Sequence, residues 1–317
     1  MEHASPRLVK ILLPYDGSPS ARLAVKLAGA LSSAGCEAIQ SLTLLHVTGG
    51  SYLARHLQNV DLRVTRLDQT KEWQRIRQRY VEEEIKPLLT QGQELLMQQG
   101  FRAPIELKIV EGKIGDLILE VAGDGNYSTI IMGRRGLSPV KELVLGSATH
   151  HVLTRATGLT VFLVGPEYND NLDRTIFPLL LPVDGSEISL EAVRQAAVLA
   201  QGDKTQNPRI TLLHVVDLAL LGLTISEEAS LLLDEGQKAL AAARQILDQA
   251  GLAEFTQEKL VSGNPARTIA QEAEAQQCAL IYMGSVGHSA LARFFIGSIT
   301  NSVLHLVTKP ALAVVYP

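Results

Sequence analysis

The stretch LLPYDGS (Leu12–Ser18) recurs as LLPVDGS (Leu180–Ser186), and this repetition decides the fold. A second stretch, TLLHV, occurs at Thr43–Val47 and again at Thr211–Val215, with the same offset of 168 residues. Matching blocks in the same order, far apart in one chain, indicate a structural unit that is written twice. The sequence therefore predicts two similar domains.

The boundary between the copies lies in the polar stretch GPEYNDNLDRT (Gly165–Thr175), which follows one apolar run and precedes the next. We place the domains at residues 1–166 and 174–317, each of ordinary domain size. Later blocks match at an offset of 151, so the first copy carries 17 extra residues between His46 and Gly112.

Each copy alternates short apolar runs with amphipathic segments of helical spacing. The runs of the first copy, which end in turn residues as strands do, are Leu8–Tyr15, Ala38–Val47, Ile105–Val110, Ser128–Gly133 and Leu159–Val164. Nearly continuous apolar strands that alternate with helices indicate a parallel sheet covered on both faces. The predicted fold class is α/β, with two tandem five-stranded parallel-sheet domains.

Composition excludes several classes of protein. The formal charge of -4 gives no electrostatic reason to expect nucleic acid or a membrane surface as a partner. No apolar run approaches the roughly 18 residues of a membrane helix, and the N-terminal residues lack the apolar core of a signal peptide. With only Cys36 and Cys278, in unrelated contexts, we expect a cytoplasmic protein whose two thiols are free and buried.

One glycine spacing occurs in both copies, in MGRRGLSPVKELVLGS (Met132–Ser147) and MGSVGHSALARFFIGS (Met283–Ser298). Each stretch leads from the fourth predicted strand to the start of a helix. Glycine permits positive φ and close approach of the backbone to a ligand, and a helix start presents unpaired N–H groups, so the loop suits a phosphate. The alternative is an ordinary turn, in which Ser147 and Ser298 cap the helices. The spacing differs from the Walker and dinucleotide motifs.

Asp16 and Asp184 end the first predicted strand of each copy. A turn aspartate that caps the next helix is one interpretation. Open α/β sheets, however, bind ligands at the carboxyl ends of strands where the strand order reverses. If the first and fourth strands are neighbours, Asp16 faces the Gly133 loop across that crevice. Because a carboxylate repels phosphate, we expect it at the base or ribose end of a nucleotide.

Together, the glycine spacing, the PVDGS stretch and the LLHV stretch resemble the universal stress protein family over nearly all of both copies. The resemblance implies a sheet ordered 3-2-1-4-5 in each domain, pairing of the domains through strand five, and a possible homodimer of whole chains. With this glycine motif it also implies binding of ATP or another adenine nucleotide, with Mg²⁺ as a companion ion. The nucleotide contacts that it implies are Asp16, Val47, Gly133, Gly136, Gly146 and Ser147 in the first repeat, and Asp184, Val215, Gly284, Gly287, Gly297 and Ser298 in the second.

The first repeat departs from the family pattern in three ways. It has Tyr15 where the second repeat has Val183, which predicts a tighter base pocket. It has Ile114 where the second repeat has the proline of the pattern. It also places Arg134 and Arg135 between the first two glycines, where they either clamp phosphates or lie in a solvated loop.

Other polar residues have simpler interpretations. His46 and His214, at the end of the second strand, are expected to be packed and hydrogen-bonded rather than catalytic. The basic segment from Ser51 to Tyr80 is expected to be a solvated helix face, with a lid or partner surface anchored by Trp73 as the alternative. We assign no metal ligand and no catalytic residue.

The sequence therefore predicts a stress or signalling protein that binds an adenine nucleotide and acts through conformation and protein partners. A slow ATPase or phosphotransferase is the enzymatic alternative, but phosphoryl transfer requires placed Mg²⁺ ligands and a group that orients the nucleophile. Neither can be named in the sequence. A dimerisation module whose glycine loops bind nothing is the third possibility.

Overall fold

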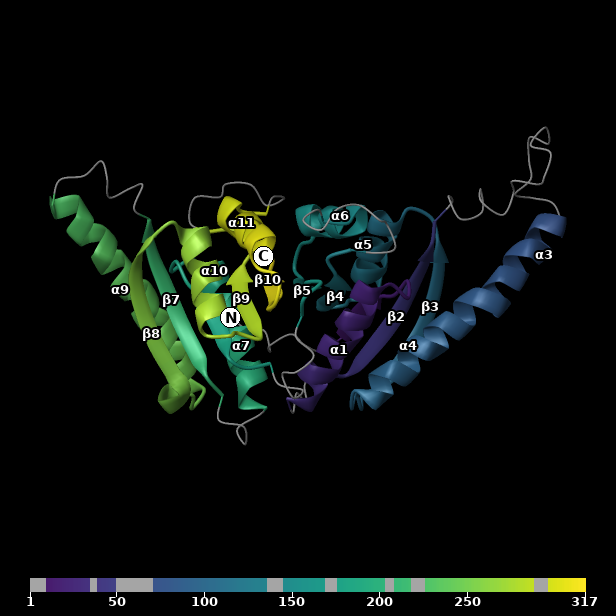
Figure 1. The fold of residues 1–317 in the computed structure, drawn as a ribbon, viewed down its shortest axis with the longest axis horizontal. Helices are drawn as coiled ribbons and strands as arrows, with labels where there is room; N and C mark the ends of the chain where they lie inside the picture. Colours follow the sequence, from purple (N-terminus) through teal and green to yellow (C-terminus); the bar gives the residue numbers. More distant parts are fainter. Residues whose placement is uncertain are drawn as a thin grey trace.

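The structure, a computed structural model, describes residues 10–34, 39–49, 71–135, 145–168, 176–202, 208–217, 226–287 and 296–317, without the side chains of 71–73 and 226–229. These residues form a single ten-stranded sheet with helices on both faces (Figure 1). The strand order is β3-β2-β1-β4-β5-β10-β9-β6-β7-β8. Each half thus has the order 3-2-1-4-5, which confirms the predicted fold class and topology. The predicted domain limits stay predictions.

The strands of the first half are β1 (Lys10–Pro14), β2 (Ser41–Thr48), β3 (Ile105–Glu111), β4 (Thr129–Gly133) and β5 (Thr160–Val164). Those of the second half are β6 (Leu179–Pro182), β7 (Ile210–Asp217), β8 (Thr256–Gly263), β9 (Leu280–Gly284) and β10 (Ala311–Val315). The helices of the first half are α1 (Pro19–Ser33), α3 (Lys71–Tyr80), the π-helix η2 (Val81–Ile85), α4 (Lys86–Gln98), α5 (Ile114–Asp124) and α6 (Ser147–Arg155). Those of the second are α7 (Glu187–Gln201), α9 (Ser226–Gln249), the short 3₁₀ helix η4 (Ala253–Phe255), α10 (Pro265–Ala275) and α11 (Ser298–Leu306).

The two halves meet at one seam, where β5 pairs with β10 antiparallel, from Thr160 opposite Val315 to Leu163 opposite Leu312. The other strand pairs among the described residues are parallel. The seam lies at the centre of the molecule in Figure 1. It confirms the prediction that the apolar fifth strands pair with each other within the chain, which removes two exposed sheet edges.

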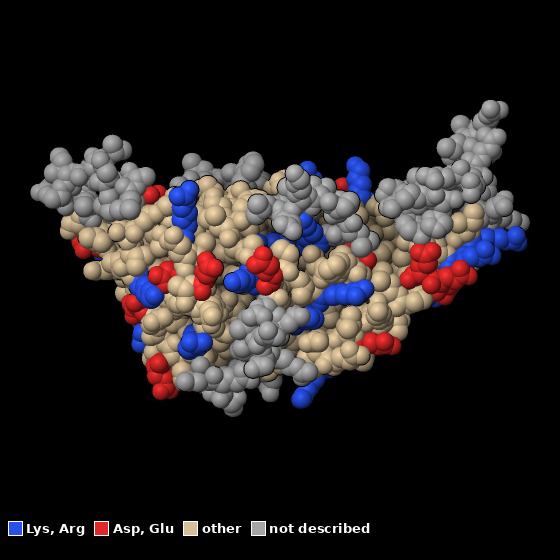
Figure 2. Space-filling model, viewed as in Figure 1, with Lys and Arg blue, Asp and Glu red and all other residues tan. Residues whose placement is uncertain are grey.

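Two hydrophobic cores run the length of the sheet, one on each face. One lies beneath α1, α4, α7 and α9, and the other beneath α5, α6, α10 and α11. Each core contains residues of both repeats, so apolar packing is continuous across the seam. Charged residues of both signs are interspersed on the face shown in Figure 2.

The turn after each first strand folds in the same way in both repeats. Asp16 Oδ1 accepts the backbone N–H of Ser18 at 3.0 Å, and Ser18 Oγ accepts the N–H of Ala21 at 3.1 Å to cap α1. Gly17 has φ +73°, a left-handed conformation that glycine adopts without strain. Part of the role of the aspartate is therefore to shape this turn, while the serine caps the helix.

A long helical segment, α3–η2–α4, runs along the edge of the first half (Figure 1). The π-helical turn at Val81–Ile85 is followed by Lys86 and Pro87, the first two residues of α4. Proline has no N–H to donate and its ring crowds the carbonyl of the preceding turn, which explains the widening at this point. The basic side chains at 75, 77 and 79 are exposed, as a solvated face requires, whereas residues 51–70 and the Trp73 side chain lie outside the described residues.

Cys278 offers a chemical test of the core. The thiol is free and buried, and burial raises its pKa to about 12 because a thiolate is poorly solvated there. We expect a Cys36→Ser protein to show almost no reaction with a disulfide reagent at about pH 8 when folded, and one reactive thiol after denaturation. Fast reaction of the folded variant would contradict this packing. Cys36 itself lies outside the described residues.

Candidate functional site

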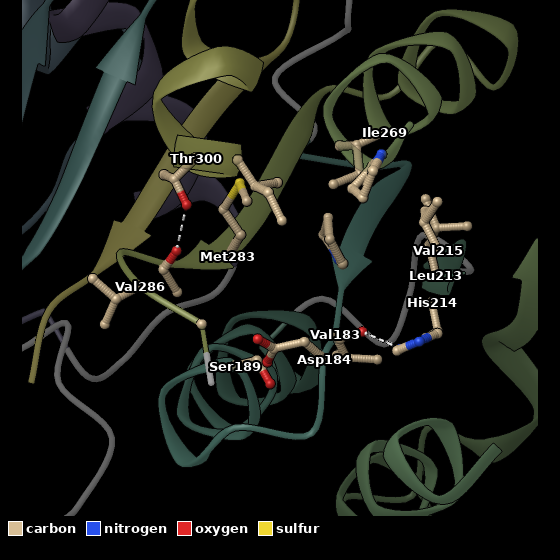
Figure 3. Close-up of a pocket in the computed structure, with 15 residues that line it drawn as sticks. Val183, Asp184, Ser189, Leu213, His214, Val215, Ile269, Met283, Val286 and Thr300 are labelled. Atoms are coloured by element: carbon tan, nitrogen blue, oxygen red, sulfur yellow. Dashed lines mark hydrogen bonds between the residues drawn. The ribbon is translucent and has the colours of Figure 1, made fainter. Parts of the chain in front are cut away.

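A pocket in the second repeat lies at the carboxyl ends of β6, β7 and β9 (Figure 3). β6 lies between β7 and β9, so the strand order reverses at this position, where open α/β sheets bind ligands. Four of the predicted contacts line the pocket together, namely Asp184, Val215, Gly284 and Gly287. Gly297 and Ser298 lie beside it, because the next two residues of α11, Ile299 and Thr300, also line it.

Asp184 stands at one end of this pocket. Its Oδ1 accepts the backbone N–H of Ser186 at 3.0 Å and the Ser186 hydroxyl at 2.6 Å. A Cβ added to Gly287 would lie 2.5 Å from Asp184 Oδ2. The carboxylate therefore lies directly against the glycine loop at Gly287, at the ends of the neighbouring strands β6 and β9.

The two ends of the glycine loop are joined at its base. In the second repeat, the Gly297 N–H donates to the Ser285 carbonyl at 2.7 Å, and the Thr300 hydroxyl donates to the Gly284 carbonyl at 2.9 Å. Thr300 is buried, so this bond fixes the first turn of α11 to the end of β9.

The first repeat makes the same two bonds. The Gly146 N–H donates to the Arg134 carbonyl at 2.8 Å, and the Thr149 hydroxyl donates to the Gly133 carbonyl at 3.1 Å. Sequence analysis missed the two threonines. The signal was present, because both copies read Gly-Ser-x-Thr at the end of the motif.

The first glycine of each motif is required by packing. A Cβ at Gly284 would overlap Ile188 Cγ2 of α7, and a Cβ at Gly133 would overlap Ser20 of α1. Positive φ, which glycine permits, does not occur at the motif glycines that the structure describes. Gly146 and Gly297 both have φ -61°, and the first glycines instead let a helix approach the strand end. Gly136 lies outside the described residues.

The helices after the loops begin without a side-chain cap. Gly146 and Gly297 occupy the N-cap positions, and Ser147 and Ser298 are the first helical residues. No described side chain forms a hydrogen bond that caps α6 or α11, so the interpretation of these serines as caps was wrong. Both serines are exposed. The helix starts therefore present backbone N–H groups and a hydroxyl beside the loop, with the positive end of the helix dipole behind them.

The rest of the second-repeat pocket is mostly apolar. Val183, Ile269 and Met283 are buried residues that contribute to its wall. His214 also lines it, and its Nδ1 lies 2.8 Å from the Val183 carbonyl. An apolar wall beside one carboxylate and one helix start is typical of small-molecule pockets.

The histidines are packed and hydrogen-bonded, as predicted. His46 Nδ1 lies 2.9 Å from the Tyr15 carbonyl, which matches the bond of His214 in the second repeat. Burial lowers the pKa of His46, so its neutral form is favoured near neutral pH.

In the first repeat, the predicted contacts occupy matching places. Asp16 follows β1, Val47 is on β2, Gly133 ends β4, and Gly146 and Ser147 start α6. The ring of Tyr15 is 2% exposed and packs against α4, where a Cβ at Gly92 would lie 2.9 Å from Tyr15 Cε1. Tyr15 is thus a core residue of this repeat, and the tighter base pocket stays a prediction.

Arg134 does not reach toward a phosphate site. It is 7% exposed, and its Nη1 donates to the carbonyls of Leu304 and Val307, at the C-terminal end of α11 in the other repeat. For Arg134, the interpretation as a phosphate clamp and the interpretation as part of a solvated loop were therefore both wrong. The sequence could not show that this side chain crosses the seam. Arg135 is half-buried and stays a candidate for a phosphate contact.

A model of the universal stress protein family matches residues 9–158 and 176–315. The chain belongs to this family. Universal stress protein MJ0531 of Methanocaldococcus jannaschii is 31% identical over 144 residues, which cover 44% of this chain and 82% of the relative. Universal stress protein YxiE of Bacillus subtilis is 30% identical over 148 residues, which cover 43% of this chain and 97% of the relative.

A crystal structure of a universal stress protein from Archaeoglobus fulgidus has the same fold. Its TM-score is 0.67 at 19% identity, and the alignment covers 97% of this chain and 98% of that chain. The two domains of this member thus have the arrangement of a solved family structure. In the described part of the chain, no helix is long and apolar enough to span a bilayer, and no three His, Cys, Asp or Glu side chains are grouped to hold a metal ion.

The threonine bond at the base of the loop can be tested by stability. Thr300→Val keeps the shape of the side chain but leaves the Gly284 carbonyl without its buried partner. We expect a loss of about 1–3 kcal/mol in the free energy of unfolding, measured with urea. As the matched control, Thr154→Val removes an exposed hydroxyl that bonds the His150 carbonyl within α6, and should change stability by less than about 0.5 kcal/mol. Equal losses in both variants would contradict a specific role of Thr300.

Proposed function

We propose that this universal stress protein binds an adenine nucleotide in the crevice of the second repeat, and in the matching crevice of the first. The convergence of Asp184, Val215, Gly284 and Gly287 on one pocket beside the start of α11 is the observation that carries this proposal. These residues come from three separate segments of the chain, and one ligand with an apolar part and an anionic part accounts for all of them.

The orientation of the nucleotide follows from charge. The start of α11 attracts anions through its backbone N–H groups and its dipole, so the phosphates lie there and along the glycine loop. The Asp184 carboxylate would repel a phosphate, but it accepts hydrogen bonds from ribose hydroxyls or a base amine. The apolar wall formed by Val183, Ile269 and Met283 is suited to a flat base.

Binding then regulates the protein in its cellular role. In this proposal, the bound state changes the conformation of the loops, and protein partners of a cytoplasmic stress response recognise that change. Mg²⁺ would accompany the phosphates of the nucleotide, and we assign no residue of this chain to it.

Calorimetry on the full chain with ATP, ADP, AMP and cyclic AMP tests the proposal. We expect ATP to bind, and Asp184→Ala to weaken binding at the second site at least tenfold, which corresponds to about 1.4 kcal/mol. Asp124→Ala, which removes an exposed carboxylate at the end of α5, is the matched control and should leave binding unchanged. No heat with any of the four nucleotides would refute the proposal. Release of phosphate during the titration would show turnover and would support the ATPase alternative.

The two repeats should differ in affinity. In the second, the Asn264 side chain caps α10 by accepting the Arg267 N–H at 3.1 Å, and Pro265 lines the pocket. In the first, α5 begins after Lys113 with no side-chain cap. A capped helix holds the pocket wall more firmly, so the second repeat should bind the base and ribose more tightly.

Single-site variants measure this difference. Asp16→Ala leaves the second site intact, and Asp184→Ala leaves the first. We expect the Asp16→Ala protein to bind ATP several-fold more tightly at physiological salt, by calorimetry. Because Arg134 is committed to the seam, Arg135 is the cation of the Arg134–Arg135 pair that stays a candidate for a salt-dependent phosphate contact at the first site. Tighter binding by the Asp184→Ala protein would reverse the ranking.

A further inference from the structure

One pair of opposite residues at the seam joins a large side chain to a small one. Phe162 on β5 lies opposite Ala313 on β10, and Ala313 is in register with Tyr282 on β9. The rings of Phe162 and Tyr282 meet edge to face, with centroids 5.6 Å apart and planes at 88°. All three residues are almost fully buried. The two rings thus close over the alanine that lies between their strands.

The repeat makes this pair informative. At the offset of 151 residues, the counterpart of Phe162 is Ala313 itself, and the counterpart of Tyr282 is Ile131. Two first repeats paired through β5 would press two Phe162 rings together at the centre. Two second repeats would place two alanines there and leave a void. Interiors tolerate neither crowding nor cavities at this scale, because they are packed as densely as crystals.

Arg134 and Gly165 form a second pair of seam residues whose counterparts in the other repeat are different. Arg134 crosses from the first repeat to the C-terminal carbonyls of α11, where the negative end of the helix dipole favours a cation. Gly165 lies beside this side chain and makes room for the backbone of the other repeat, because a Cβ there would overlap the Thr308 carbonyl. Burial lowers the pKa of Arg134 to about 10, so the guanidinium stays charged at neutral pH.

The second repeat makes the reciprocal contact with other residues. The counterparts of Arg134 and Gly165 are Ser285 and Tyr316. The Tyr316 hydroxyl donates to the Leu153 carbonyl in α6 at 2.7 Å. One long side chain thus crosses the seam in each direction, from a different position in each repeat. Two first repeats would bury two guanidinium groups in a single seam, at a large cost in desolvation.

A buried polar cluster at the seam is centred on Gln195 of the second repeat, and the described part of the first repeat has no equivalent around the counterpart residue. Gln195 on α7 accepts the hydroxyl of Thr160 at 2.6 Å across the seam, and the hydroxyl of Tyr282 at 2.9 Å. The counterparts of Gln195 and Thr160 are Leu27 and Ala311. In a seam between two first repeats, the Thr160 hydroxyl would face leucine and lose its partner, which is costly for a buried group.

We propose that the seam is a heterospecific interface. The strand-five face of the first repeat accepts the face of the second repeat and rejects a copy of itself. Its partner is therefore always the opposite repeat, from the same chain or, by exchange, from a second copy of this chain. The two nucleotide crevices of the proposed function are then held as an unlike pair, and association of whole chains must use another surface. This inference does not depend on nucleotide binding.

Exchange of the differing residues within the full chain tests the proposal. The first-repeat set is Arg134, Phe162 and Gly165, and the second-repeat set is Ser285, Ala313 and Tyr316. One half-exchange (R134S/F162A/G165Y) gives both faces the second set, and the other (S285R/A313F/Y316G) gives both faces the first set. The full exchange combines all six substitutions and restores unlike faces. Leu163→Val with Val314→Leu, on the same strands but in the opposite core, is the matched control.

Each half-exchange should lower the thermal midpoint by roughly 5 °C or more. Light scattering should show self-association of these variants, because the seam opens and exposes the fifth strands. The thermal midpoint of the full exchange should fall by much less than the sum of the decreases in the two half-exchanges, and the oligomeric state should remain that of the wild type. A loss equal to that sum, or half-exchanges as stable as wild type, would overturn the proposal.

Failure to fold is also informative. If the half-exchanges yield no folded protein but the full exchange does, the proposal is supported. If the full exchange does not fold either, the milder substitutions Phe162→Leu and Ala313→Val are used. The double variant should then lose less stability than the sum of the losses of the two single variants, and strictly additive losses would refute the heterospecific seam.

Discussion

The antiparallel pairing of β5 with β10 is the interaction on which the rest of the molecule depends. Each fifth strand is fully buried and mostly apolar. In a single repeat it would be an exposed sheet edge, and the hydrophobic core on each face of the sheet would be exposed beside it. Their pairing joins two five-stranded sheets into one and lets both hydrophobic cores run through the centre. The two repeats are therefore one folded body.

The same strands hold the glycine loops. The backbone N–H of Arg134 donates to the carbonyl of Val164 at 3.0 Å, and that of Ser285 donates to the carbonyl of Val315 at 2.8 Å. Each loop thus leaves the sheet from a residue that is bonded to the last residue of a seam strand. Its other end returns to the same residue through the N–H of the third glycine. The shape of each crevice consequently depends on the seam.

The duplicated chain uses its two copies differently. Where the copies agree, as in the Asp-Gly-Ser turn and the Gly-Ser-x-Thr ending, the structure repeats the same bonds in both crevices. Some of the residues that differ lie at the seam, namely a charged residue, an aromatic residue and a polar cluster. This distribution is what a protein needs if two similar sites must be held by an interface with two unlike faces.

The sequence by itself determined the repeat and the order of strands and helices, because periodicity and turn residues are local properties. The topology of each half and the pairing of the fifth strands came from the resemblance of its motifs to the universal stress protein family. Asp184 and the glycine loop were expected at one crevice, since strand ends in a parallel sheet converge, and the resemblance to the family added Val215. The packing role of the first glycines and the uncapped helix starts were outside its reach, because they depend on what lies opposite each residue. The loop-closing threonines had a signal in the repeated Gly-Ser-x-Thr ending, but their bond partners are visible only in the structure.

Arg134 shows the limit most clearly. In the sequence it lies between two glycines of a predicted phosphate loop, and a cation there is a reasonable phosphate ligand. Only the tertiary structure brings the end of α11 within its reach and gives the guanidinium two carbonyls instead. The decisive partner lies about 170 residues away in the chain, and no local pattern carries information over that distance.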